Sequence, residues 1–264
     1  MEITVLGKSP AWQDVGGACS GYLVSEGDTK ILIDCGNGVF GKLREHSDYA
    51  EIDAVVVSHM HADHFFDLIP FAFANSFALR SSGLPGAVPS GPAEPSETSL
   101  FSPPGSTEAF GMVTGVWGMP DLIPQSFDYR EYDPSEVLEL GPLKVSFQFV
   151  PHYIDAWAIE VTGSSGGRFV FGADCRPNEE LVGFAEGADV LLAEATLLVP
   201  EPDPDDRGHL TPFEAGEHAR DAGVDRLVLT HISDEVDPDW ATASAAEAFS
   251  GRIDVAFEGM RLDV

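Results

Sequence analysis

The chain is poor in basic residues. Its 264 residues include 14 Lys and Arg against 44 Asp and Glu, which gives a formal net charge of −30 at pH 7. Nucleic-acid affinity rests largely on Lys and Arg side chains that displace counterions from phosphates, so this composition argues against a nucleic-acid partner. The same excess of negative charge argues against attraction to anionic membrane lipid.

Cysteines and long apolar runs are also scarce. Cys19, Cys35 and Cys175 form no CxxC pair, which predicts free thiols rather than disulfides. The longest apolar stretches, such as 54–57 and 190–193, are strand-length, far below the roughly 18–20 residues of a membrane-spanning helix. The first residues lack the basic region and cleavage site of a signal peptide, so we expect a cytoplasmic protein with no membrane partner.

The remaining composition is that of a globular protein, with 44% hydrophobic and 22% charged residues. Short β-branched runs alternate with helical periodicity in both halves of the chain, which predicts a layered α/β fold. The expected strands are 3–6, 21–24, 30–33, 53–57, 143–150, 156–161, 168–171, 190–193 and 227–230. The expected helices are 36–46, 63–79 and 211–222.

One segment, 80–106, interrupts this alternation. It contains 17 Gly, Pro and Ser among 27 residues, a composition that predicts an irregular surface loop between the two halves. Such a loop could be a variable excursion or a flap over an active site.

Three imidazoles and one carboxylate lie within six residues, directly after the apolar strand 54–57. Residues two apart on an extended chain point the same way, so His59 and His61 can share one ion. If a helix begins at Asp63, then Asp63 and His64 face another side and can address a second ion. Because polarity this dense is costly to bury without a metal, the cluster predicts metal binding.

His152, Asp174 and His231 each follow another expected strand. Ligands at strand ends converge on one edge of a sheet, which is how an α/β scaffold assembles a site. Taken singly, each of these residues is equally compatible with a structural role.

The segment 59–64 matches the HxHxDH motif of the metallo-β-lactamase superfamily. A segment that resembles another motif of this family precedes it at 32–38, and further such segments follow in order at 172–177, 193–196, 209–211 and 229–231. The set is most similar to the branch that contains ribonuclease Z and related phosphodiesterases. The resemblance implies a single domain over residues 1–264, folded as an αββα sandwich of two packed β-sheets with helices on the outer faces.

The resemblance also implies a dinuclear metal site. It assigns one divalent ion to His59, His61 and His152, a second to Asp63, His64 and His231, and the bridging position to Asp174. The ions are usually zinc in this family, although manganese or iron also suits mixed His and carboxylate ligands. His209 matches a histidine used near the leaving group, with Glu194 as its partner.

The implied reaction is hydrolysis by a hydroxide bound to two metals, since two adjacent divalent ions lower the pKa of a bridging water. Asp63 would hold or accept the proton, and a protonated His209, supported by Glu194, would donate one to the leaving oxygen.

Arg176 could clamp a phosphate or form an ordinary salt bridge. We expect Asp34 to fix the metal loop by hydrogen bonds, and His46 and His218 to face solvent.

Ribonuclease Z proper grips tRNA with a basic arm between the third histidine and the bridging aspartate. Here the interval 152–174 is filled by two expected strands and a Gly/Ser turn, which leaves no room for an arm. We therefore expect a small phosphodiester, such as a cyclic nucleotide, as the substrate. The alternatives are tRNA 3′ processing, lactone or thioester hydrolysis, and a catalytically silent metal-binding protein. Relatives are often dimers, which suggests a homodimer by analogy.

Overall fold

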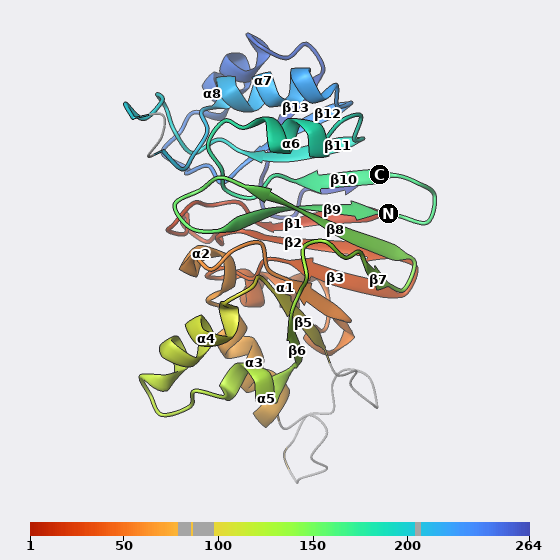
Figure 1. The fold of residues 1–264 in the computed structure, drawn as a ribbon, viewed down its shortest axis with the longest axis vertical. Coiled ribbons are helices and arrows are strands. Elements are labelled where there is room, and N and C mark those ends of the chain that lie inside the picture. The colour runs from red at the N-terminus through yellow and green to blue at the C-terminus, as the bar shows by residue number, and fades with distance from the viewer. Residues whose placement is uncertain (79–85, 87–97, 204–206) are drawn as a thin grey trace.

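The computed structural model describes residues 1–78, 86, 98–203 and 207–264. Two sheets lie face to face in the middle of the molecule, with helices on both outer sides (Figure 1). The predicted αββα sandwich is therefore confirmed. No helix of the described ranges combines the length and the apolar character needed to cross a membrane.

The first sheet holds most of the N-terminal half. Its strands, in spatial order, are β14 (Arg261–Asp263), β1 (Glu2–Gly7), β2 (Gly21–Glu26), β3 (Thr29–Ile33), β4 (Ala54–Val56), β5 (Ser99–Ser102) and β6 (Asp128–Glu131). The strands from β14 to β3 pair antiparallel, and those from β3 to β6 pair parallel. The carboxyl ends of the parallel strands therefore share one edge.

The second sheet repeats this design. Its strands, in spatial order, are β13 (Arg252–Val255), β12 (Arg226–Thr230), β11 (Val190–Glu194), β10 (Arg168–Phe171), β9 (Ala156–Thr162), β8 (Leu143–Val150) and β7 (Leu138–Leu140). The strands from β10 to β13 are parallel, and those from β7 to β10 form an antiparallel meander. Each half thus joins a meander to crossover helices, as the sequence predicted.

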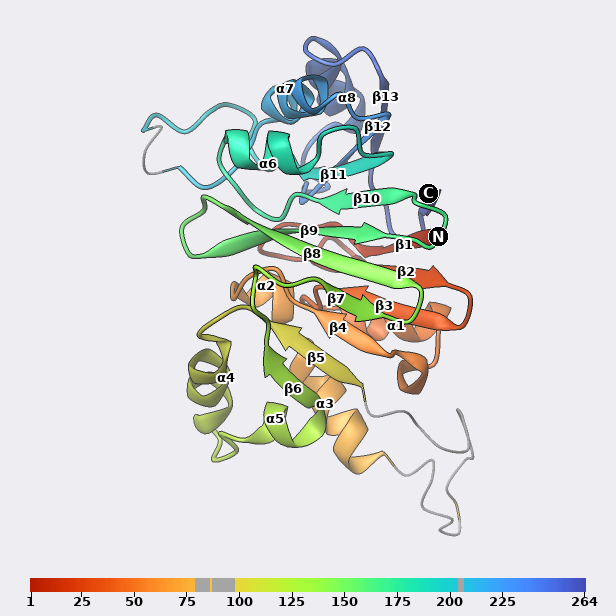
Figure 2. The ribbon, with the colours of Figure 1, turned by 45° about the vertical axis from the view of Figure 1, so that its right-hand side comes forward.

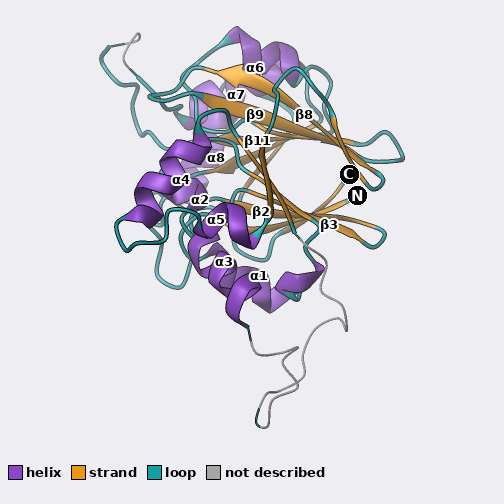
Figure 3. Cartoon of the chain, turned by 60° about the horizontal axis from the view of Figure 1, so that its bottom comes forward, coloured by secondary structure: helices purple, strands orange, loops and turns teal. Residues whose placement is uncertain are grey.

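Helices cover the outer face of each sheet (Figure 2). The first sheet carries α1 (Val39–His46), the short 3₁₀ turn η1 (Tyr49–Glu51), α2 (Ala62–Phe65), α3 (Leu68–Phe77), α4 (Ser106–Gly115) and α5 (Leu122–Ser126). The second carries α6 (Glu179–Phe184), α7 (Pro212–Ala222) and α8 (Pro238–Ala246). Figure 3 shows the strands lying between the group of α6 and α7 and the group of α1 and α3.

The core follows from strand alternation. Ile31 and Ile33 of β3 join the cluster between the sheets, whereas Leu32 joins the cluster under the helices of the first sheet. Side chains of a strand alternate between its two faces, so one strand serves two apolar layers. Across the central layer the rings of Tyr22 and Phe171 lie 5.0 Å apart, an aromatic contact that ties the two sheets together.

Two expectations require correction. Within the loop expected at 80–106, Ser99–Ser102 form strand β5 and α4 begins at Ser106; residues 80–85 and 87–97 lie outside the described residues. The helix expected at 63–79 is divided into α2 and α3. Pro70 is the cause, because a proline lacks the N–H and clashes with the preceding turn, so it is tolerated only in the first turn of a new helix.

Candidate metal centre

The side chains of the centre come from the carboxyl ends of strands in both sheets. The chain leaves β4 at Val56, crosses the sheet edge and enters α2. On the way His59 forms an isolated β-bridge with Ala156, and the N–H of Trp157 donates to the carbonyl of Ser58 at 3.2 Å. These bonds join the loop of the first sheet to β9 of the second, so ligands from both sheets can meet.

The structure brings all seven expected metal ligands together in two sets. Potential ligand atoms lie within 4.8 Å of one another among His59, His61 and His152, and likewise among Asp63, His64, Asp174 and His231. Oδ2 of Asp174 lies 3.3 Å from Nε2 of His231 and 3.4 Å from Nε2 of His64. It also lies 4.0 Å from Nε2 of His59, which places Asp174 between the two sets.

The imidazoles are held by their outer nitrogens. Nδ1 of His64 donates to Asp34 Oδ2 at 2.7 Å, and Nδ1 of His152 donates to the carbonyl of Gly208 at 2.7 Å. The same atom of His231 lies 2.7 Å from the hydroxyl of Thr196. Such bonds fix the tautomer and leave Nε2 as a lone-pair donor for a metal.

The ligand atoms of the first set, which consists of His59, His61 and His152, are arranged to bind a cation. Nδ1 of His61 lies 3.2 Å from Nε2 of His59 and 3.0 Å from Nε2 of His152. Burial, together with the neighbouring histidines, lowers the pKa of His59 well below its usual value and that of His61 to about 4. Three neutral imidazoles that point nitrogens at one another need a shared positive charge, which a metal ion supplies.

The second set, which consists of Asp63, His64, Asp174 and His231, also favours a bound positive charge. Burial lowers the pKa of His64, but the charges of Asp174 and Asp34 raise it well above its usual value. Burial raises the pKa of Asp63, yet the contact with His231 and the charge of His64 bring it down to about 2. Within the described part of the chain, His64 Nε2 and Asp174 Oδ1 are buried without a hydrogen-bond partner. These residues therefore fit a divalent metal.

A histidine–carboxylate pair borders the metal-ligand sets. Nδ1 of His209 donates to Oε1 of the fully buried Glu194 at 2.9 Å and lies 3.9 Å from Oδ2 of Asp174. Burial lowers the pKa of His209, but the adjacent charge of Glu194 and their hydrogen bond raise it to about 9. The contact with Glu194 therefore favours the protonated form of the imidazole at position 209.

Comparison with known proteins gives the family. Residues 116–232 match the "Beta-lactamase superfamily domain" family, and residues 1–85 match the family "Anti-Pycsar protein Apyc1". "Probable metallo-hydrolase YhfI" of Bacillus subtilis is 28% identical over 98% of each chain. The YhfI crystal structure aligns with a TM-score of 0.84 at 26% identity, covering 99% of this chain and 98% of YhfI. The chain belongs to the metallo-β-lactamase superfamily.

Further relatives show to which branch of the metallo-β-lactamase superfamily this hydrolase belongs. "Uncharacterized protein Rv1339" of Mycobacterium tuberculosis is 32% identical over 96% of this chain and 88% of its own length. "Ribonuclease Z" of Myxococcus xanthus is 26% identical over 100% of this chain and 98% of its own length. The protein is thus a metallo-hydrolase of the ribonuclease Z and phosphodiesterase-like branch, and this family membership implies that it binds a divalent metal.

Residues that orient the expected metal ligands were found only in part from the sequence. Asp34, expected to hold the metal loop by hydrogen bonds, accepts from the N–H of Ser58 at 2.7 Å and its hydroxyl at 2.8 Å, as well as from His64. Thr196 was missed: its hydroxyl donates to Oε2 of Glu194 at 2.7 Å and accepts from His231. Its place two residues after Glu194, at a strand end, was the available signal.

Backbone conformation is unusual at the same edge. Asp34, Ala173 and His231 have φ angles of 56°, 53° and 51°, and they are the non-glycine residues with positive φ in the described ranges. They follow β3, β10 and β12 within two residues. A left-handed residue bends the chain sharply, which turns the side chains after each strand toward the metal centre.

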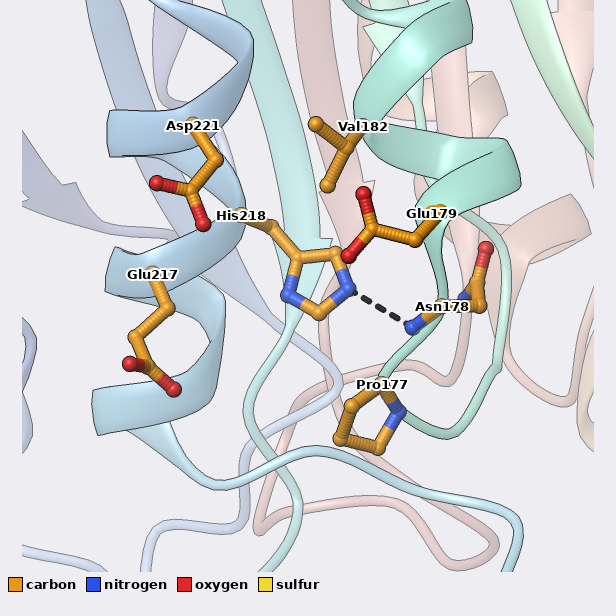
Figure 4. Close-up of a pocket in the computed structure, with 7 residues that line it drawn as sticks. All are labelled: Pro177, Asn178, Glu179, Val182, Glu217, His218 and Asp221. Atoms are coloured by element: carbon orange, nitrogen blue, oxygen red, sulfur yellow. Dashed lines mark hydrogen bonds between the residues drawn. The ribbon is translucent and has the colours of Figure 1, made fainter.

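His218 was expected to face solvent, and this was wrong. It is buried on α7, where Nδ1 donates to the carbonyl of Glu214 at 2.7 Å and Nε2 accepts from the backbone N–H of Asn178 at 3.1 Å (Figure 4). It lines a pocket of about 250 Å³ between α6 and α7, together with Pro177, Asn178, Glu179, Val182, Glu217 and Asp221. The pocket includes none of the expected metal ligands. His46, in contrast, is exposed as expected.

Proposed function

We propose that this protein is a phosphodiesterase that holds two divalent ions and hydrolyses a small phosphodiester. The first ion would be held by His59, His61 and His152, and the second by Asp63, His64 and His231, with Asp174 shared between them. The carrying observation is the position of Asp174 between two complete donor sets. Zinc suits these ligands best, and manganese or iron is also compatible with them.

When bound, the ions would supply a water of lowered pKa and neutralise charge on the phosphoryl oxygens. The protein would supply the proton transfers. Asp63, whose pKa is held at about 2, stays ionised and would accept a hydrogen bond from the attacking water. His209 carries a proton at neutral pH, and because Glu194 holds Nδ1, the transferable proton is the one on Nε2. It would pass to the leaving oxygen.

Two observations favour a small substrate. The interval between His152 and Asp174 is occupied by β9, β10 and the turn at 163–167, and no further element lies in this described interval. The net charge of −30 opposes a long polyanion. A cyclic nucleotide or a similar organic phosphodiester is therefore the proposed substrate class.

A second candidate is tRNA 3′ processing, because full-length relatives carry the name "Ribonuclease Z". Lactone or thioester hydrolysis would use the same ligand sets. A homodimer stays a prediction, for which the mass in solution is the measurement.

The test is hydrolysis of bis-p-nitrophenyl phosphate, followed by a panel of cyclic nucleotides beside a precursor tRNA. We expect activity that a chelator removes and that Zn²⁺ or Mn²⁺ restores. His61→Ala should abolish turnover and lower the bound metal, while His46→Ala, at an exposed position, should change neither. Efficient precursor-tRNA trimming at physiological salt would favour the second candidate. Bound metal without hydrolysis of any phosphodiester, tRNA, lactone or thioester would overturn the enzymatic proposal.

A further inference from the structure

Tyr153 is a half-exposed aromatic ring at the border of the metal centre. It directly follows His152 in the turn between β8 and β9, and 49% of its surface is exposed. The centroid of its ring lies 5.0 Å from that of His152 and 5.6 Å from that of His209. The ring therefore contacts one proposed metal ligand and the proposed proton donor.

The ring is held in place at two points. Its hydroxyl donates to Oε1 of Glu201 at 2.6 Å, and Oε2 of Glu201 accepts from the N–H of Gly208 at 3.1 Å. A Cβ at Gly208 would lie 2.5–2.7 Å from atoms of the Tyr153 ring, so the ring packs directly on a backbone without a side chain. The carbonyl of Gly208 in turn accepts from His152. A ring that is already ordered loses little entropy when a ligand stacks on it.

The position of the ring points to the leaving-group side of the substrate, because it contacts His209. Because Tyr153 is half-exposed, its fixed phenol ring offers planar apolar surface to a ligand, and the carboxylate of Glu201 beside it disfavours a further negative charge on the ligand. A heterocyclic base is planar, uncharged and stacks well on tyrosine. A sugar phosphate without a base would have nothing to place there.

We propose that Tyr153 is a specificity-determining residue whose ring stacks on the base of a nucleotide phosphodiester, on the leaving-group side of the metal centre. This inference rests on the proposed phosphodiesterase function and narrows its substrate class to nucleotides.

The test compares adenosine 3′,5′-cyclic phosphate with the base-free methyl riboside 3′,5′-cyclic phosphate. Tyr153→Ala should raise the KM for the nucleotide at least about tenfold, the effect of one lost stacking contact, and leave the KM for the base-free diester unchanged. Tyr153→Phe keeps the ring and should stay within about threefold of wild type. Trp240→Ala removes another exposed aromatic ring, on α8, and should have no effect.

A binding measurement separates this inference from the proposed function. In calorimetry with the metal-loaded protein, adenosine 5′-monophosphate should bind more tightly than ribose 5-phosphate, and Tyr153→Ala should remove the difference. Equal losses with both diesters, or a Phe variant as impaired as the Ala variant, would show that Tyr153 only braces the loop and would overturn the inference. If wild-type protein hydrolyses no phosphodiester, the proposed function fails, and the calorimetric difference still decides for or against stacking.

Discussion

Nδ1 of His209 lies 2.9 Å from Oε1 of Glu194, a carboxylate with no exposed surface. The pair joins the protonated imidazole to the network of Thr196 and His231, since the Thr196 hydroxyl donates to the other oxygen of Glu194. A buried anion that faces an imidazole favours the charged form of the imidazole. The pH dependence of turnover should therefore depend on His209.

The activity of the enzyme should fall in alkali as His209 loses its proton. Its pKa is about 9, so the acid form is present below that pH and is lost as the pH rises through it. His209→Asn should remove this alkaline limb and lower kcat by about 10²–10⁴-fold for a diester with an alkoxide leaving group. A nitrophenolate departs without protonation, so bis-p-nitrophenyl phosphate should be much less affected. Equal losses for both substrates would contradict a proton-donor role.

Asp34→Asn should weaken metal binding. Asp34 accepts hydrogen bonds from Ser58 and from Nδ1 of His64, and loss of such an outer partner lowers metal affinity about 10–100-fold. Competition with a chelator measures the change. Asp53→Asn is the matched control, because Asp53 also accepts from a backbone N–H, that of Lys30, but in an exposed position. The prediction fails if both variants retain metal equally.

Gly36→Ala should disturb the metal loop. A Cβ at Gly36 would lie 1.8 Å from the backbone oxygen of Asp63, and the adjacent N–H of Cys35 already donates to the carbonyl of His64 at 2.7 Å. We expect a loss of unfolding free energy of about 1–3 kcal/mol or more in urea melts, with less bound metal.

Gly41→Ala provides the control for this close approach. Gly41 lies within α1, and a Cβ there meets nothing within 4 Å. Alanine is the better helix former, so this variant should gain about 0.5–1 kcal/mol. If both variants were destabilised to a similar extent, the close approach of Gly36 to the backbone of Asp63 would not be the reason why a side chain at position 36 destabilises the fold.

His218→Ala should destabilise the fold without removing metal. The variant leaves the N–H of the half-buried Asn178 without its imidazole acceptor between α6 and α7, and the loss of one such hydrogen bond costs about 0.5–1.5 kcal/mol. Thermal unfolding measures the loss, and metal content should equal that of wild type. Glu217→Ala, on the same helix but less buried, should change stability much less. Metal loss in His218→Ala alone would instead assign His218 a role in positioning Asp174.

Hydrophobic periodicity and motif spacing were sufficient to predict those strands and helices that bury one apolar face. The expected strands 143–150 and 168–171 coincide with β8 and β10 because both present apolar side chains to the central layer. The expected ligands meet because their strands end at one edge. His218 could have been predicted to be buried, since Ala215, Ala219 and Ala222 share its helix face.

Other elements and contacts could not be predicted, because the local sequence carries no pattern that indicates them. β6 reads Asp-Tyr-Arg-Glu and is largely exposed, so only its pairing with β5 makes it a strand. β5 was hidden because its four residues end a segment dominated by Gly, Pro and Ser. The hydrogen bond between Thr196 and His231 joins residues 35 positions apart. Tertiary contacts of this kind override local propensity.

The left-handed residues at the strand ends set a limit on engineering. A non-glycine residue in this conformation costs roughly 1–2 kcal/mol, so selection for heat resistance alone would favour glycine at positions 34, 173 and 231. At Asp34 and His231 that change would delete side chains on which the metal centre depends. Ala173 contributes no polar group and is fully buried. Its methyl group packs in the central core, so the strain that glycine would relieve there is offset by lost burial and by the greater freedom of glycine in the unfolded chain.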